Sequence, residues 1–588
     1  MSNPESAHRT RLGLRIPMRD GVTLSALLVR PLGEGPFPTI FRLTPYIADT
    51  FLTDGVAFAM RGYAYVCADV RGRGESGGGP YRQMRPDGLD GHDAIAWIAD
   101  QPWSDGNVVL HGSSYSGTNQ WTIAATRPPA LRAICPAGVS LAGFDYPRPG
   151  GILPASIFQI LTLTAGRALH GNALADTGQW NRWLTQIWRS DGRLTDLSDL
   201  SGNPAPLFHE IAQGATGAEP FVGAMLDPDD YAAIEVPVLS STGVADLTCA
   251  GTLEAHRRFL AHGQADAITR SRLVIGPWEH LGLETGNPQV GLLRHGPAAA
   301  LDMRALKLDW FDWILGRGPE PDALHAPALV YRAGEDRWVR GPSLEALTGE
   351  PQVFGLGDER LLPPGAPEPL AATRRAFLCD PGDFAAVEPE LRLRDAPAPT
   401  KDNAPTIRVG PSYNDLTGCA IGSDPTNQVF QTDLGGRGLE WMSDPLPVPL
   451  SLCGHPRVQM WLELDGVDTD LAFFLDAVLP QGDALTLSAD LLRLRDRAGI
   501  GKEALASPGA SLLLARDLRF VSRTLPAETR LRFVVRHCTS IRLEKNLQSA
   551  TPVRWQMPAE AVAVRVAVLS GPDHRSSLTL PIAQGDGQ

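Results

Sequence analysis

The chain has few cysteines for its length and no excess of positive charge. Its 588 residues include seven cysteines, namely Cys67, Cys135, Cys249, Cys379, Cys419, Cys453 and Cys538. None falls in a Cys-Xaa-Xaa-Cys pair, so a structural zinc site is not expected. Their odd number and apolar neighbours predict small buried side chains in a reducing compartment. The formal net charge of −13 argues against nucleic acid or an anionic membrane surface as a partner.

Long apolar runs are also missing. The most apolar stretch, residues 151–165, is interrupted by Pro154, Ser156 and Gln159 and is too short to span a bilayer. Residues 1–15 are mostly polar and contain no apolar core of a secretory signal. We therefore expect a cytoplasmic protein without membrane contacts. At 588 residues, of which 43% are hydrophobic, the chain should form two or three domains.

The most informative segment is Gly112-Ser113-Ser114-Tyr115-Ser116-Gly117. It lies between a short run typical of a β-strand, residues 107–110, and a run compatible with a helix from Tyr115 onwards. A strand that turns sharply into a helix through small residues is the setting of a nucleophile elbow. Ser114 is the best candidate for the nucleophile, because Gly112 precedes it by two residues and the small Ser116 follows it by two. The alternative is an ordinary turn rich in glycine and serine.

A serine nucleophile needs a base to take its proton and an acid to orient that base. Asp246 follows the strand candidate at residues 237–242, and His280 follows the next one, at residues 272–276. In a doubly wound sheet the chemistry gathers at the carboxyl ends of the strands. Asp246 and His280 are therefore the candidate acid and base.

Each of these assignments has a competitor. Asp246 could instead cap the helix expected over residues 252–262. His256 and His262 compete with His280, but both fall inside that helix, where a surface role is favoured. Glu279 could serve as the acid, although residues adjacent in sequence rarely face each other. The order serine, aspartate, histidine, with each residue after a suitable element, favours the triad.

The glycine-rich segment Asp69–Gly77 superficially suggests a phosphate loop. It lacks the Gly-Lys-Ser/Thr ending, and no helix opens directly after it, so a nucleotide site is not expected. We interpret it as a structural turn after a strand over residues 64–68. Asp69 and Arg71 should pair there with other charged groups and take no part in catalysis.

Changes in the spacing of hydrophobic residues along the sequence divide the chain into domains. Residues 1–143 and 236–320 alternate strand-type and helix-type runs, which predicts the two parts of one α/β domain with a doubly wound sheet. Residues 144–235 lack strand signals and show helical spacing, which predicts a helical cap over the active site or a separate small domain. Residues 321–588 contain short alternating runs between turns, which predicts an all-β sandwich.

Six segments together carry a resemblance to a known family. They are Met18–Thr23, Leu43–Tyr46, Asp69–Gly77, Gln101–Gly106, Gly112–Gly117 and Gly276–His280. With them the chain resembles, over nearly its whole length, the α/β-hydrolases related to cocaine esterase and X-prolyl dipeptidyl aminopeptidase, known as CocE/NonD hydrolases. The form Gly-Xaa-Ser-Tyr-Xaa-Gly and its spacing from the Gln-Pro-Trp segment are specific to this family.

The resemblance implies an α/β-hydrolase domain, a C-terminal jelly roll and a triad of Ser114, Asp246 and His280. It also implies an oxyanion hole made by the backbone N–H of Tyr115 and the phenol hydroxyl of Tyr46. Without the resemblance, a packed loop aromatic is the favoured interpretation of Tyr46. The mechanism needs no metal and no organic cofactor.

The substrate is less well defined by the sequence. Three activities of the family compete, namely ester hydrolysis, release of X-prolyl dipeptides, and acyl transfer on β-lactam-type amines. The α-amino acid ester hydrolases of this family place carboxylates two and three residues after the triad acid. Thr248 and Cys249 stand there in this chain, which disfavours α-amino esters.

The aromatic residues of the predicted cap favour an apolar or aromatic substrate group. The expected pocket residues are Phe158, Trp180, Trp183, Trp188 and Trp278. We therefore expect a serine carboxylesterase that acts on a small-molecule ester or amide, with a second copy of the chain as a candidate partner in a homodimer. The remote alternative is a non-catalytic carbohydrate-binding protein with an inert hydrolase domain.

Overall fold

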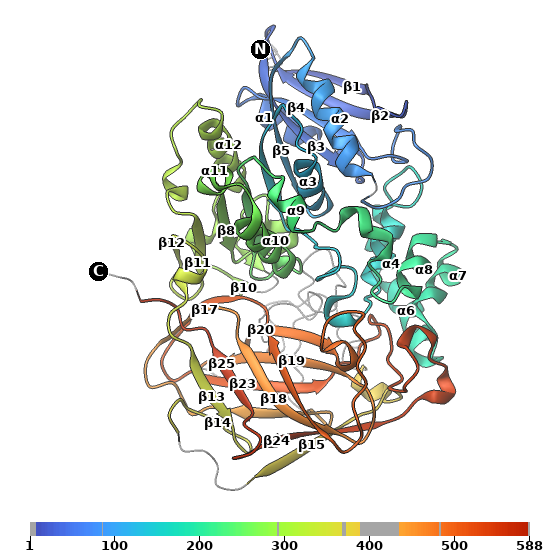
Figure 1. Ribbon diagram of the computed structural model, residues 1–588, viewed down its shortest axis with the longest axis vertical. Helices are drawn as coiled ribbons and strands as arrows, with labels where there is room; N and C mark the ends of the chain where they lie inside the picture. Colours follow the sequence, from blue (N-terminus) through green and yellow to red (C-terminus); the bar gives the residue numbers. More distant parts are fainter. Residues whose placement is uncertain are drawn as a thin grey trace, which may run out of the picture.

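The computed structural model describes residues 8–84, 86–290, 293–366, 372–387, 434–480 and 484–585. An α/β domain lies above an all-β domain in the view of Figure 1, and a group of helices lies beside their junction. Every candidate site residue from the sequence falls within the described ranges, whereas Cys419 lies outside them. The other six cysteines are buried thiols, as the sequence predicts.

A ten-stranded mixed sheet forms the centre of the α/β domain, with the strand order β1-β2-β4-β3-β5-β6-β7-β8-β11-β12. The strands from β4 to β11 in this order pair in parallel, and β2 and β12 pair antiparallel with their neighbours. The carboxyl ends of β3, β5, β7 and β8 therefore share one edge of the sheet. The strands are β1 His8–Pro17, β2 Thr23–Pro31, β3 Phe37–Thr44, β4 Ala64–Asp69, β5 Ser104–Ser113, β6 Leu131–Ala137, β7 Leu239–Gly243, β8 Arg272–Gly276, β11 Ala328–Arg332 and β12 Arg337–Gly341.

Alternate residues of the buried strands face two separate hydrophobic cores. In β4, Val66 joins the core under α2, α3 and α10, while Tyr65 and Cys67 join the core under α1 and α12. Near-continuous apolar strands are typical of a parallel sheet that helices cover on both faces. These helices are α1 Leu52–Ala59, α2 Asp87–Ala99, α3 Tyr115–Ala125, α10 Cys249–His262, α11 Ala265–Thr269 and α12 Met303–Ile314.

The sheet continues beyond residue 320, where the sequence analysis ends the α/β domain. β11 pairs in parallel with β8, with Leu329 opposite Val274, and forms a hairpin with β12. The boundary expected at residue 320 is therefore wrong by at least this hairpin. The apolar run of β11 fits either domain, and only its long-range pairing with β8 assigns it.

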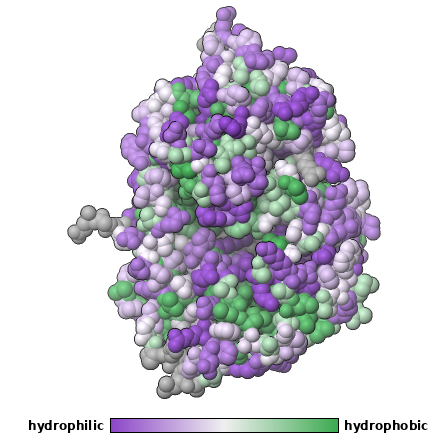
Figure 2. Space-filling model, viewed as in Figure 1, coloured by the Kyte–Doolittle hydropathy of each residue, from purple (hydrophilic) through white to green (hydrophobic). Residues whose placement is uncertain are grey.

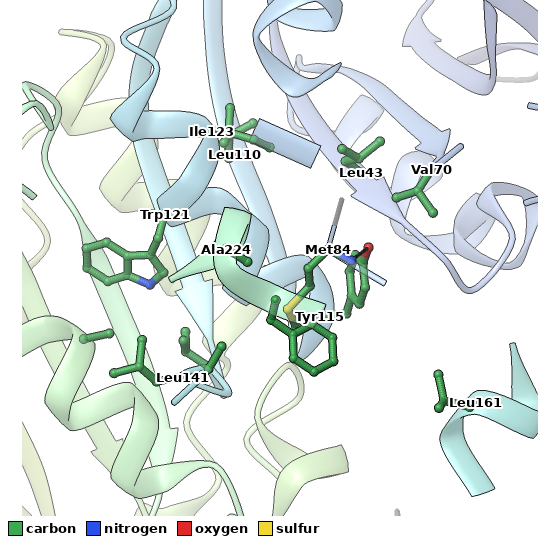
Figure 3. Close-up of a cluster of buried hydrophobic side chains, with 14 of the residues drawn as sticks. Leu43, Val70, Met84, Leu110, Tyr115, Trp121, Ile123, Leu141, Leu161 and Ala224 are labelled. Carbon is green, nitrogen blue, oxygen red and sulfur yellow. Dashed lines mark hydrogen bonds between the residues drawn. The ribbon is translucent and has the colours of Figure 1, made fainter. Parts of the chain in front are cut away.

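The segment between β6 and β7 is helical, as expected for residues 144–235. Its apolar side chains, such as Phe208, join the core that covers α3. Figure 3 draws part of this core, in which Leu161 and Ala224 come from the helical segment and Tyr115 and Trp121 from α3. The helical segment therefore packs on the α/β domain. Its helices are α4 Ser156–Leu163, α5 Gly171–Ala175, α6 Thr177–Arg189, α7 Leu197–Ser201, α8 Pro206–Gln213 and α9 Pro228–Ala232.

The described part of the C-terminal domain is all-β, with a seven-stranded, a four-stranded and a two-stranded antiparallel sheet. In β18 every second side chain is buried, and Val458 and Met460 pack in one core with Phe473 of β19 and Phe533 of β23. The strands are β13 Gln352–Leu356, β14 Leu361–Leu362, β15 Thr373–Cys379, β16 Gly438–Met442, β17 Leu450–Gly454, β18 Arg457–Leu464, β19 Asp470–Val478, β20 Ala484–Arg493, β21 Ser511–Asp517, β22 Val521–Leu525, β23 Arg530–His537, β24 Val564–Ser570 and β25 Ser577–Leu580, and β9 Gln289–Val290 and β10 Leu293–Arg294 form a separate hairpin.

A buried ionic bridge joins the two domains. Glu544 Oε2 of the C-terminal domain accepts hydrogen bonds from Arg148 Nη1 and from Arg493 Nη1, each at 2.8 Å. Arg148 precedes α4 and also donates to the carbonyls of Ile211 and Ala212 in α8. The bridge therefore ties the helical segment to the C-terminal domain. None of the helices in the described part of the chain has the length and apolar character needed to span a bilayer.

Candidate active site

The turn from β5 into α3 is centred on Ser114. β5 ends at Ser113 and α3 begins at Tyr115. Ser114 has φ 58° and ψ −125°, a conformation that residues other than glycine rarely adopt. Its N–H donates to Ala137 O of β6 at 2.9 Å, and its carbonyl accepts hydrogen bonds from the first turn of α3. These contacts hold the strained residue in place, as in a nucleophile elbow.

The flanking glycines are required by close approach. A Cβ atom on Gly112 would lie 2.6 Å from Ser116 Cβ, and one on Gly117 would lie 2.4 Å from Ala137 O. Ser116 is itself buried, and its hydroxyl donates to Leu43 O at 2.9 Å. Gly112 and Ser114 both have a positive φ, at 152° and 58°, and the Ser116 hydroxyl has a structural role.

Asp246 and His280 meet at the end of the two neighbouring strands β7 and β8. These strands pair in parallel with Gly243 opposite Gly276, so the loops that follow them emerge side by side. His280 Nδ1 lies 2.8 Å from Asp246 Oδ1. This is the contact by which a carboxylate orients a catalytic imidazole and fixes its tautomer.

The Asp246 carboxylate is buried and fully engaged. Oδ1 accepts from Thr248 N at 3.0 Å, and Oδ2 accepts from Thr248 Oγ1 at 2.8 Å and Thr242 Oγ1 at 3.2 Å. Burial favours the neutral acid, but the charge and hydrogen bond of His280 and the bonds from Thr248 outweigh it and lower the pKa of Asp246. Asp246 therefore stays ionised at neutral pH. The contact of Thr248 with Asp246 was not predicted, and its position two residues after Asp246 was the one signal for it in the sequence.

Ser114 and His280 line one large cavity of 1520 Å³ between the α/β and C-terminal domains. The surface in the space-filling view is hollowed at the level where these domains meet (Figure 2). Apolar side chains from three places form part of its wall, namely Phe144, Ile157 and Ile160 of the helical segment, Leu247 after β7, and Phe520 of the C-terminal domain.

The competing residues occupy other positions. His256 also borders the cavity, but it is buried in α10, its Nδ1 lies 2.9 Å from Ser240 Oγ, and burial lowers its pKa to about 4. His262 is exposed at the end of α10. Glu279 directly precedes His280 in the loop after β8, whereas the carboxylate in contact with the His280 ring is that of Asp246.

Tyr46 and Tyr115 both approach Ser114. The Ser114 side chain acts on the Tyr46 phenol and partly offsets the rise of its pKa on burial, and the rings of Tyr46 and Tyr115 lie 6.4 Å apart, edge to face. Burial raises the pKa of Tyr46, so the phenol keeps the proton that an oxyanion donor needs. Tyr115 is the first residue of α3, and its backbone N–H has no acceptor within that helix. Its own phenol accepts a hydrogen bond from Met84 N at 2.7 Å.

A buried charge cluster lies beneath the elbow and was not predicted. Glu284, four residues after His280, accepts a hydrogen bond from Lys307 Nζ at 2.7 Å and lies 3.5 Å from His111 Nε2. Burial raises the pKa of Glu284, but the charges of Lys307 and Arg42 outweigh it and hold that pKa well below its usual range, while burial lowers the pKa of His111 to about 3 and keeps this imidazole neutral. Arg42 and His111 precede Tyr46 and Ser114 on β3 and β5. The only signal in the sequence was a charged residue inside each of two apolar runs.

The aromatic residues that the sequence analysis assigned to the pocket lie elsewhere. Phe158, Trp180 and Trp188 are buried in the core that the helical segment shares with α3, and Trp183 packs edge to face on Trp180. Trp278 is fully buried on the other face of the sheet and donates to Ala299 O at 2.9 Å. None of the five is among the described residues that line the cavity, so this prediction is wrong. The apolar face of α6 is used for packing instead.

Two domain families and a curated relative match this chain. Residues 20–282 match the X-Pro dipeptidyl-peptidase (S15 family) domain, and residues 381–536 match the X-Pro dipeptidyl-peptidase C-terminal non-catalytic domain. The cocaine esterase of Rhodococcus sp. (strain MB1 Bresler) is 26% identical over 607 residues, which cover 96% of this chain and 97% of that protein.

Solved structures share the fold over almost the full length. An α-amino acid ester hydrolase, 20% identical, superposes with a TM-score of 0.78 and covers 99% of this chain and 98% of its own. An aminopeptidase from a marine sediment archaeon, Thaumarchaeota archaeon, is also 20% identical, with a TM-score of 0.79 and the same coverage. A CocE/NonD family hydrolase from Staphylococcus aureus, 15% identical, has a TM-score of 0.64 and covers 97% of this chain and 93% of its own.

A hydrolase sheet, a serine at a strained elbow and relatives that are serine esterases define the class of this protein, which is an enzyme of the serine hydrolase type. Within that class, the chain carries the catalytic and C-terminal domains of the X-Pro dipeptidyl-peptidase (S15) family and is similar to a cocaine esterase over nearly its whole length, which confirms the resemblance drawn from its sequence motifs.

Proposed function

We propose that the protein hydrolyses carboxylic esters through a triad of Ser114, His280 and Asp246. The contact of 2.8 Å between His280 Nδ1 and Asp246 Oδ1, on the same cavity as the strained Ser114, is the observation that carries the proposal. The three residues come from the loops after β5, β7 and β8. A buried carboxylate bonded to an imidazole beside such a serine is the arrangement that activates a hydroxyl nucleophile.

The proposed reaction proceeds in two steps. Ser114 Oγ attacks the carbonyl carbon while His280 Nε2 takes its proton, and Asp246 stabilises the imidazolium. The Tyr115 N–H and the Tyr46 hydroxyl donate to the oxyanion of the tetrahedral intermediate. His280 then protonates the departing alcohol, which leaves an acyl ester on Ser114. Water, deprotonated by His280, attacks this acyl-enzyme and releases the acid.

The helical segment and the C-terminal domain both border the cavity of the triad, and we propose a separate role for each. We propose that the helical segment acts as a cap, since Ile157 and Ile160 of α4 line the cavity of Ser114 and His280. We also propose that the seven-stranded and four-stranded sheets of the C-terminal domain form a jelly roll. That domain borders the same cavity through Arg519 and Phe520, so it would help to enclose the substrate.

The wall of the cavity favours a neutral ester over an α-amino ester. Thr248 and Cys249 stand where α-amino acid ester hydrolases carry carboxylates, and both are buried, with Thr248 bonded to Asp246. The cocaine esterase relative extends over nearly the whole chain, which supports ester cleavage. Release of X-prolyl dipeptides is the second candidate, favoured by the match of residues 20–282 to the S15 family. A homodimer and a cytoplasmic location stay predictions from the sequence.

A fluorophosphonate probe and a panel of chromogenic substrates test the proposal. We expect covalent labelling of the purified protein, and faster turnover of p-nitrophenyl esters than of a prolyl-dipeptide anilide. A graded series of acyl lengths then measures the apolar part of the site. Efficient cleavage of the anilide with poor ester turnover would favour the peptidase instead. A protein that neither labels nor hydrolyses would refute the enzyme and favour the binding-protein alternative.

A further inference from the structure

Arg73 joins the loop of Tyr46 to the loop after α4 through main-chain carbonyls. It lies in the turn of residues 69–77 after β4, and its side chain is completely buried. Nε donates to Pro45 O at 2.8 Å, directly before Tyr46. Nη1 donates to the carbonyls of Thr164, at 2.8 Å, and of Gly166, and Nη2 donates to Ala168 O at 2.9 Å. One guanidinium therefore spans the loop of Tyr46 and the loop that follows α4.

The loop of Tyr46 is strained and held at both ends. Ile47, the residue after Tyr46, has φ 67°, which a β-branched residue adopts only where its surroundings force it. The next residue, Ala48, donates its N–H to Asp69 Oδ1 at 2.8 Å. Asp69 and Arg73 thus fix Tyr46 from its two sides. Asp69 was predicted to pair with another charged group. Its carboxylate instead accepts a hydrogen bond from Ala48 N–H and so holds the loop of Tyr46 in place.

The charge of Arg73 also acts on Tyr46. Arg73 lies over the Tyr81 ring, with its guanidinium carbon 5.6 Å from the ring centre. Burial lowers the pKa of Arg73, but a guanidinium with an ordinary value above about 12 remains charged at neutral pH. Burial raises the pKa of the Tyr46 phenol, and the charge of Arg73 offsets part of that rise.

We propose that Arg73 is a positioning residue that holds the Tyr46 hydroxyl at the oxyanion site and couples it to the helical segment. The inference rests on the proposed role of Tyr46 as oxyanion donor. It gives the Asp69–Gly77 segment a function in catalysis. Arg73 itself is not among the described residues that line the cavity, so it would act through Tyr46.

A double-mutant cycle with ester turnover tests this coupling. Tyr46→Phe should lower kcat by about 10²–10³ with little change in KM, as for loss of one oxyanion donor. Arg73→Lys keeps the charge and loses the fork of donors, and should lower kcat at least tenfold. In the Tyr46→Phe background the same change should lower kcat less than twofold, because the group that it positions is already gone.

Arg71→Lys is the matched control in the same turn. Arg71 pairs with the exposed Asp20 and the buried Asp90 rather than with the loop of Tyr46, so its replacement by the equally charged lysine should leave kcat within twofold in both backgrounds. If Arg73→Lys fails to fold, Asp69→Ala is the substitute, because it releases the same loop at Ala48. This change should lower kcat in the wild-type background and have no effect on kcat in the Tyr46→Phe background.

The outcomes separate the inference from the proposed function. Equal losses in both backgrounds would make Arg73 merely structural and overturn the inference. An intact kcat in Tyr46→Phe would also overturn it, because Arg73 would have no donor to position, while the esterase itself would stand. A wild-type protein without ester turnover or labelling would instead refute the proposed function, and the inference with it.

Discussion

Ser114 has a strained backbone, and the glycines on either side of it leave no room for larger side chains. The strain persists because Ala137 and the first turn of α3 bind its N–H and carbonyl. We expect Ser114→Ala to abolish fluorophosphonate labelling and to lower kcat by about 10⁶, the scale known for triad serines. Ser113→Ala and Ser116→Ala should still label, since neither hydroxyl is at the strained position. Labelling that survives in Ser114→Ala would overturn the assignment.

Asp246 and His280 determine how activity depends on pH. The pKa of Asp246 is lowered, so this carboxylate stays ionised as the pH falls through the range where histidine gains a proton. Activity should therefore rise with pH through an apparent pKa near that of histidine, about 6.5 before local shifts. Asp246→Asn should lower kcat by up to about 10⁴, because the imidazole would adopt the wrong tautomer.

The control for this prediction is His256, which lies in α10 and is bonded to Ser240. His256→Ala should retain the pH profile, whereas His280→Ala should have no turnover. Steady-state kinetics over the pH range separate these variants. Near-normal turnover of Asp246→Asn would mean that another carboxylate, such as Glu279, orients the base.

At the level of elements, much of the α/β domain could be predicted from the sequence. β8 coincides with the expected strand at residues 272–276, and α3 begins at the expected Tyr115. Short apolar runs bounded by turn residues mark buried parallel strands whatever their neighbours are. Contacts between distant segments leave no such local pattern. The β8–β11 pairing, the Arg73 bonds and the packing of Trp180 therefore had to come from the structure.

The contact of α3 with β6 is an element-scale test. Gly117 lies where the helix crosses the strand, and an added Cβ would be 2.4 Å from Ala137 O. Gly117→Ala should push α3 away from β6, destabilise the protein by about 1–3 kcal/mol and lower kcat by displacing the elbow. Gly171 at the start of α5 has no atom within 4 Å of an added Cβ. Gly171→Ala should leave Tm and kcat nearly unchanged, and an equal effect of both changes would contradict this interpretation.

Across the whole molecule, Glu544 connects the domains through two buried arginines. Glu544→Gln leaves Arg148 and Arg493 without their shared carboxylate, and breaking a buried ion pair costs about 3–5 kcal/mol. The change should lower Tm and, by loosening the wall of the cavity, raise KM. Glu463→Gln is the control, because its partner Arg374 is half exposed and such pairs contribute at most about 1 kcal/mol.

The stabilisation that the Glu544 ion pairs provide should also depend on pH. Burial raises the pKa of Glu544, but Arg148 and Arg493 outweigh it, and the pKa in the folded protein is lowered. A lowered pKa stabilises the fold above the unfolded value of about 4.3, and that stability is lost as the pH falls through the folded value. The Tm difference between wild type and Glu544→Gln should therefore shrink below about pH 4. A difference independent of pH would contradict an ionic role.

The size of the cavity between the domains has a consequence for the fate of the acyl-enzyme. At 1520 Å³ it exceeds the roughly 300–1,000 Å³ of a typical small-molecule pocket. An alcohol of moderate size therefore fits beside the acylated serine and competes with water for the acyl group. In mixtures with a simple alcohol we expect the acyl group to partition between free acid and a new ester. The ratio of new ester to free acid, measured by chromatography, should rise with alcohol concentration. For substrates whose turnover is limited by acylation, the rate of p-nitrophenol release should stay unchanged.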